Sequence, residues 1–123
     1  MEARDLALGL SGARIAVGVA SLLAPGLVVR AMMGPEGHSS GMRLLFRVVG
    51  VRDLALGIGV LVALERDAPV RGWLQASAVV DGLDAAGSLL ARHQLRPTVF
   101  PAAAGAATAG ALLSVWLSGQ LDT

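Results

Sequence analysis

The sequence contains no cysteine, no lysine and no tyrosine, and it has few charged residues of either sign. Without cysteine, the 123-residue chain cannot be a disulfide-stapled scaffold. Charged residues make up 15% of the chain, against about 25% in soluble domains, which is too little polar surface to cover a soluble fold. The ten basic residues are all arginine and are scattered along the chain, so no basic patch for nucleic acid is present and no nucleic-acid partner is expected.

Apolar residues dominate the composition instead. Hydrophobic residues make up 54%, and the 16 glycines raise the apolar share to about two-thirds, whereas soluble proteins reach about 45–50%. This composition excludes intrinsic disorder and indicates that lipid is the natural solvent. We therefore expect one integral membrane domain over residues 1–123, a multi-pass protein of the plasma membrane.

Four apolar segments are separated by short polar or turn-forming links. The segment 97–121 carries no charge over 25 residues, which is long enough to cross a hydrocarbon layer of about 30 Å. The other three contain a few charges in mid-segment, as expected of residues that face a bundle interior. Links this short make successive helices antiparallel neighbours. The sequence thus predicts an all-α fold, an up-down four-helix transmembrane bundle, with helices at about 6–29, 43–64, 72–91 and 99–118. Pro25 is a candidate to kink or end the first of these helices.

The helix predicted at 72–91 carries four polar residues on one face. Ser77, Asp81, Asp84 and Ser88 are spaced by four, three and four residues, which matches the helical period. A carboxylate at the bilayer centre costs about 2.5–3.5 kcal/mol on insertion scales, and two carboxylates one turn apart also repel each other. This face therefore points away from lipid. Either one carboxyl is protonated, or arginines from other helices lie against the pair.

The helices predicted at 6–29 and 43–64 supply these arginines. Arg14 lies inside the first, and Arg47, Arg52 and Asp53 lie inside the second. Together with Asp81 and Asp84 they give three arginines and three aspartates, an electroneutral polar core. Arg52 and Asp53 point about 100° apart, so they cannot both aim at the same neighbouring helix.

One stretch of the chain resembles a known family. The residues 43–57, with Arg47, Arg52 and Asp53, are followed in the next helix by Asp81-Gly82-Leu83-Asp84. In these residues the chain resembles small four-helix integral membrane proteins of high-GC bacteria, a family of unknown function. The resemblance implies a membrane location and four spans, and it implies no activity.

Paired intramembrane carboxylates point first to acid–base chemistry on a lipophilic small molecule, such as an isomerisation, an epoxide opening or a cyclisation. Asp81 and Asp84 would be the proton-transfer pair, Asp53 a partner or second base, and Arg52 the group that keeps one carboxylate ionised. The candidates for substrate binding are Arg14, Arg47, Ser77 and Ser88. We expect no cofactor. We expect no metal either, because His38 and His93 lie in links without a third ligand.

Two other functions remain open. The chain could be a structural or accessory membrane subunit, because Arg–Asp networks also fix helix register without chemistry. Its helix at 99–118 would then mediate assembly, as a homo-oligomer or within a larger membrane complex. The residues that give this helix a face of small side chains at every fourth position are Ala102, Ala106, Gly110, Ser114 and Ser118. An oligomeric proton-coupled transporter is the third possibility.

Overall fold

The computed structural model describes residues 2–34, 39–90, 92–93, 97 and 99–121. Every regular element in these ranges is an α-helix, so the prediction of an all-α chain is confirmed. The helices are α1 (Ala3–Leu23), α2 (Pro25–Met33), α3 (Ser40–Glu65), α4 (Arg71–Leu90) and α5 (Val99–Gln120). The helices predicted at 43–64, 72–91 and 99–118 correspond to α3, α4 and α5 within a few residues at each end.

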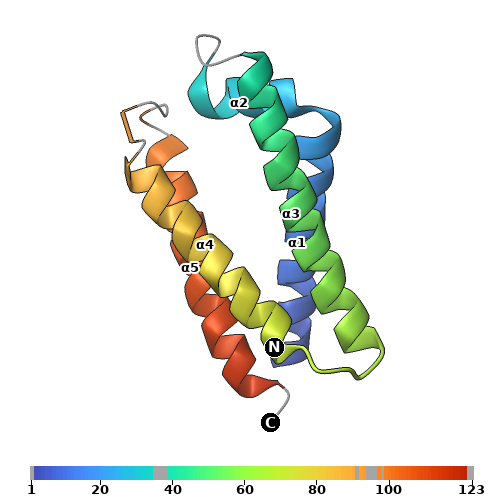
Figure 1. Cartoon of the computed structure of the whole chain (residues 1–123). Helices are drawn as coiled ribbons and strands as arrows, with labels where there is room; N and C mark the ends of the chain where they lie inside the picture. The colour runs from blue at the N-terminus through green and yellow to red at the C-terminus, as the bar shows by residue number, and fades with distance from the viewer. Residues whose placement is uncertain (1, 35–38, 91, 94–96, 98, 122–123) are drawn as a thin grey trace.

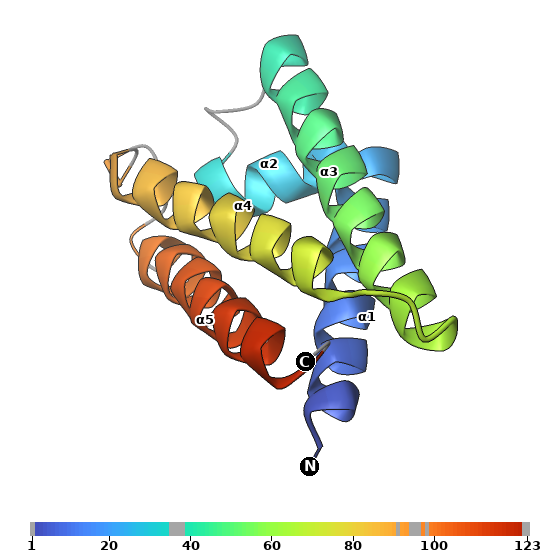
Figure 2. The same cartoon turned by 60° about the horizontal axis from the view of Figure 1, so that its bottom comes forward.

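The single helix predicted at 6–29 is wrong, because the chain bends at Pro25. Proline has no backbone N–H, and its ring clashes with the carbonyl of the preceding turn of a helix. Accordingly α1 ends at Leu23, Ala24 takes a non-helical conformation (φ −132°, ψ 56°), and Pro25 occupies the first turn of α2. Figure 2 shows α2 turned away from the direction of α1.

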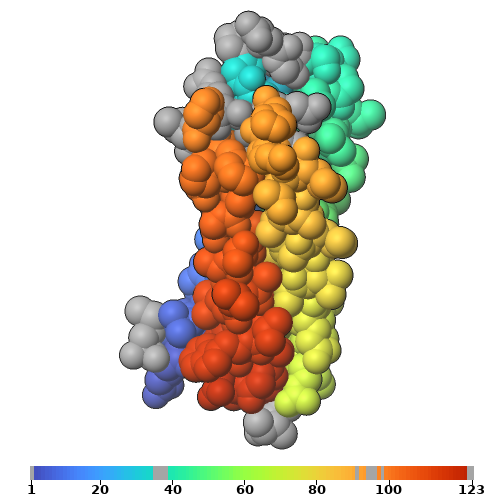
Figure 3. All heavy atoms as spheres, turned by 90° about the vertical axis from the view of Figure 1, so that its left-hand side faces the viewer, coloured from blue at the N-terminus to red at the C-terminus, as the bar shows by residue number. Residues whose placement is uncertain are grey.

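Four of the five helices form two antiparallel pairs, and the short α2 packs against α3. α1 lies along α3, and α4 lies along α5, whereas the contacts between the two pairs are fewer (Figure 1). Figure 3 shows α4 and α5 side by side over the length of one face of the molecule.

Glycines bring the backbones of α1 and α3 into contact. A Cβ atom on Gly18 would lie 2.7 Å from the carbonyl oxygen of Gly50, and one on Gly50 would lie 2.8 Å from the carbonyl oxygen of Gly18. About two turns further along, Ser11 donates its hydroxyl to the carbonyl oxygen of Gly57 at 2.6 Å. Small residues allow the backbones of two apolar helices to approach closely. Van der Waals packing then stabilises the contact even where no hydrophobic effect drives the helices together.

The apolar core occupies one end of the molecule, where α1 begins and α5 ends (Figure 1). Both helix pairs contribute to it, so this is where they meet most closely. Its buried members are Ala7, Val60, Ala63, Leu64, Val70, Leu74 and Leu117. The middle of the molecule is different, since its buried side chains include serines and charged residues.

The outer surface is apolar along all five helices. Leu23 is 74% exposed, Leu90 is 84% exposed, and α3 and α5 likewise expose leucines and valines. α1 and α5 are each long and apolar enough to cross a membrane.

The glycine contact predicts a contrast between two alanine substitutions in α1. Gly18→Ala should lower the free energy of unfolding by about 1–3 kcal/mol, because its methyl group would overlap backbone atoms of α3. Gly12→Ala meets no atom within 4 Å and should be neutral, or stabilising by up to about 1 kcal/mol through helix propensity. Unfolding followed by circular dichroism measures both. Equal stability of the two variants would contradict the α1–α3 contact.

Candidate functional site

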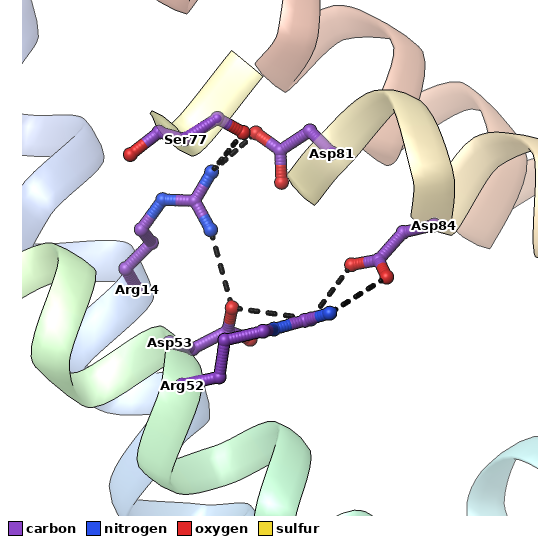
Figure 4. A network of polar contacts seen from close by, with 6 residues as sticks. All are labelled: Arg14, Arg52, Asp53, Ser77, Asp81 and Asp84. Carbon is purple, nitrogen blue, oxygen red and sulfur yellow. Dashed lines mark hydrogen bonds and ion pairs between the residues drawn. The ribbon is translucent and has the colours of Figure 1, made fainter. Parts of the chain in front are cut away.

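Arg14, near the middle of α1, is the centre of a buried ionic cluster (Figure 4). Its Nη1 donates to Oδ1 of Asp53 on α3 at 3.2 Å, and its Nη2 forms an ion pair with Oδ2 of Asp81 on α4. Nη2 also donates to the backbone carbonyl of Ser77 at 3.4 Å. The Arg14 side chain is only 9% exposed, so one guanidinium holds three helices together away from the surface.

Arg52 on α3 forms the second half of the cluster. Its Nη1 and Nη2 donate to the two carboxylate oxygens of Asp84 on α4 at 3.0 and 2.8 Å, a bidentate pair. Its Nη2 also reaches Oδ1 of Asp53 at 3.4 Å. The Arg52 and Asp84 side chains are 30% and 39% exposed, so this half of the cluster reaches the molecular surface.

The two halves share a carboxylate and form one continuous chain of ion pairs. Oδ1 of Asp53 accepts from both guanidinium groups, which gives the order Asp81, Arg14, Asp53, Arg52, Asp84. We call these five residues the Arg–Asp network. It bridges the α1/α3 pair to the α4/α5 pair in mid-helix, above the apolar core.

Helix geometry explains which residues meet. Arg52 and Asp53 are adjacent and point about 100° apart, so Asp53 faces α1 while Arg52 faces α4. Asp81 and Asp84 are about 60° apart, so one reaches Arg14 and the other Arg52. A glycine on α5 makes room for Asp81, because a Cβ atom on Gly110 would lie 2.6 Å from its Oδ2.

The expected charge balance of the cluster is wrong, because Arg47 lies outside it. Arg47 is exposed, and its Nε donates to the carbonyl oxygen of Leu22 at 3.3 Å, at the end of α1. Five residues along a helix correspond to about 140° of rotation, so Arg47 and Arg52 cannot face the same neighbour. The Arg–Asp network therefore contains three aspartates and two arginines, a formal charge of −1.

The two predicted serines differ in their positions. Ser77 is buried beside Arg14, but it contributes its backbone carbonyl, while its hydroxyl has no hydrogen-bond partner among the described residues. Ser88 is half-buried on the same face of α4 and lies beyond the network. Ser114 of α5, which the sequence placed only on the small-residue face, is a further fully buried polar residue. Its buried hydroxyl is likewise unpartnered in the described part of the chain.

Half of the small-residue face of α5 is used within the chain. Ser114 is fully buried, Ser118 is 8% exposed, and Gly110 lies against Asp81. Ala102 and Ala106, toward the other end of α5, are exposed. Among the described residues of this face, Ala102 and Ala106 are the two that are available to another molecule.

The histidines show no metal centre in the described residues. His93 is exposed in a turn after α4, and His38 lies outside the described residues. No group of three or more histidine, cysteine, aspartate or glutamate side chains is arranged to hold a metal ion in the ranges that the structure covers.

No family model, curated protein or solved structure matches the chain. The class of protein is therefore described from the fold and the site alone. The chain is an all-α protein with an apolar exterior, two closely packed helix pairs and an ionic network between them.

The network predicts that Arg14 and Arg47 differ in their contribution to stability. Arg14→Gln would leave Asp53 and Asp81 without their common guanidinium, and breaking a buried pair costs about 3–5 kcal/mol. Arg47→Gln removes one hydrogen bond at the surface and should change stability little. Chemical unfolding of both variants measures this, and similar midpoints would show that the buried pairs do not hold the fold.

Gly110 provides a second test of the network. Gly110→Ala would place a methyl group against the Asp81 carboxylate and push it away from Arg14, at an expected cost of about 1–3 kcal/mol. Gly105→Ala, also on α5, meets no atom within 4 Å and serves as the matched control. Equal stability of Gly110→Ala and Gly105→Ala would contradict the contact between Gly110 and the Asp81 carboxylate.

Proposed function

We propose that the protein is a multi-pass integral membrane protein in which α1, α3, α4 and α5 cross the bilayer as an up-down four-helix bundle. The shortest of them, α4, has 20 residues and a length of about 30 Å, which equals the thickness of the hydrocarbon layer. The surface supports this placement, because leucines and valines are exposed on every helix. An ionic interior inside an apolar exterior is the arrangement that a bilayer favours.

Within this bundle, we propose that the Arg–Asp network performs acid–base chemistry on a lipophilic small molecule. The observation that carries the proposal is its formal charge of −1, since the three carboxylates exceed the two guanidinium groups. A net charge inside a bilayer is costly, and one bound proton neutralises it. The network is therefore suited to hold and exchange a single proton.

Asp84 is the group through which the network would exchange this proton with a ligand. Its side chain is 39% exposed, whereas Asp53 and Asp81 are each 11% exposed and enclosed by helices. Arg52 holds the Asp84 carboxylate by two parallel hydrogen bonds, which fixes its orientation and stabilises its ionised form.

The simplest reaction that this arrangement supports is an isomerisation. The Asp84 carboxylate removes a proton from a carbon next to a double bond, and the proton that the network holds is donated to the far carbon of that double bond. The double bond moves, the network recovers its proton, and no co-reactant is consumed. Epoxide opening and cyclisation begin with the same proton donation.

A structural role as an accessory membrane subunit is the second candidate, and one observation favours it. Two cavities in the described part of the chain, of about 360 and 180 Å³, are lined by none of the network aspartates. In this role the ion pairs only fasten the α1/α3 pair to the α4/α5 pair, and the exposed apolar surface contacts a partner.

Infrared spectroscopy of the protein in lipid nanodiscs distinguishes the two functions. Acid–base function predicts absorption from one protonated carboxyl per chain near neutral pH. Asp84→Asn should abolish it, because the network then has two carboxylates and two guanidinium groups. Asp67→Asn, in the exposed turn after α3, is the control and should leave it unchanged. If the wild type has no protonated carboxyl and Asp84→Asn only lowers stability, the structural role holds instead.

A further inference from the structure

A cavity of about 360 Å³ lies at the bend between α1 and α2, at the end of the molecule opposite the apolar core. Three arginines line it: Arg30 from α2, and Arg43 and Arg47 from the first half of α3. No acidic residue is among the lining residues that the structure describes. The cavity is therefore a site of concentrated positive charge.

The charge of these arginines is not balanced within the described part of the chain. Arg47 donates to the carbonyl of Leu22, and Arg43 donates to the hydroxyl of Ser40 at 3.3 Å, so both partners are neutral. The Arg30 side chain has neither an ion pair nor a hydrogen bond to a described residue. In the Arg–Asp network, by contrast, each arginine is paired with carboxylates.

The position of Arg43 makes the need for a counter-ion stronger. Arg43 is in the first turn of α3, where the helix dipole already places positive charge, and that turn has no acidic residue. α2 also starts at this cavity with an uncapped first turn, since Ala24 has no side-chain oxygen. Three positive charges that line one cavity favour an anion among them.

The rim of the same cavity is apolar. Leu23 and Leu27 line it and are 74% and 70% exposed. A site lined by exposed arginines and exposed leucines fits an amphiphile, in which an anionic head continues into hydrocarbon chains. Guanidinium groups bind phosphate oxygens by paired hydrogen bonds, which suits three arginines to a phosphate head.

We propose that this cavity binds the phosphate group of an anionic phospholipid, whose acyl chains lie along Leu23 and Leu27. The phosphate chemistry follows from the arginines alone. The lipid source rests on the proposed membrane location, whereas a free phosphate ion would need only the three guanidinium groups. The proposal does not depend on the proton chemistry of the network.

Thermal unfolding of the protein in a maltoside detergent, which contains no phosphate, separates these sources. Added phosphatidylglycerol should raise the unfolding temperature, because a ligand that binds only the folded state stabilises it. Phosphatidylcholine, with no net charge, should raise it less, and inorganic phosphate should not raise it. A shift of the same size with inorganic phosphate alone would overturn the lipid source and assign the site to free phosphate.

Arginine variants locate the effect. Arg30→Gln removes no hydrogen bond within the described chain, so it should fold normally and bind phosphatidylglycerol about fivefold more weakly. Arg43→Gln should weaken binding by a similar factor. Arg92→Gln is the matched control, because Arg92 is exposed after the last turn of α4 and is not a cavity residue. Its affinity should equal that of the wild type.

The result that overturns the proposal is equally direct. If neither phosphatidylglycerol nor inorganic phosphate gives a shift, or if Arg30→Gln and Arg92→Gln retain the same affinity, the cavity is not a phosphate site. Neither result bears on the protonated carboxyl of the network, so failure of this site and failure of the acid–base function can be told apart.

Discussion

The structure depends on one guanidinium group that three helices share. Arg14 comes from α1, Asp53 from α3 and Asp81 from α4, and all three side chains are at least about nine-tenths buried. Removing Arg14 leaves Asp81 without an ion-pair partner among the described residues, and breaking a buried pair in this way costs far more than the pair itself contributes. The close approach of Gly18 and Gly50 sets the distance between α1 and α3 at which Asp53 meets Arg14. Packing and electrostatics therefore specify the same arrangement.

The molecule has three levels along its helices. Apolar side chains fill one end, the Arg–Asp network occupies the middle, and a cavity with three arginines lies at the other end. The surface around all three levels is rich in leucine and valine. In a bilayer this order would place the network near the centre and the arginine cavity near the headgroups. The acid–base proposal then concerns the middle level, and the lipid proposal concerns the level at the end of the molecule. The two sites use arginines in opposite ways. Those of the network are paired with carboxylates, whereas those of the cavity have no carboxylate partner among the described residues.

Sequence periodicity predicted the aspartates of α4 well and their partners less well. The spacing of Asp81 and Asp84 places both on one face of any helix, and burial in an apolar chain requires a cation beside them. Which arginine meets which aspartate depends on how far one helix is shifted along another, which hydropathy does not encode. Arg47 was expected in the network because it lies inside the helix predicted at 43–64, although its rotation from Arg52 turns it toward the end of α1. The bend at Pro25 was detectable as a proline, but its consequence, a cavity between α2 and α3, required the tertiary structure.

The central claim is that the Arg–Asp network lies inside a bilayer. Spin labels on the outer surface near the network test this claim, because their accessibility reports their depth in the membrane. Because the chain has no cysteine, Val79→Cys and Leu112→Cys each introduce a single site for a nitroxide label. Both positions are exposed on the outer surface, close in sequence to Asp81 and Gly110 respectively. In liposomes, electron paramagnetic resonance should find both labels accessible to oxygen and inaccessible to a water-soluble nickel complex. A label introduced by Arg92→Cys should show the reverse. Labels at Val79 and Leu112 that respond to the nickel complex as strongly as the label at Arg92 would contradict the membrane placement.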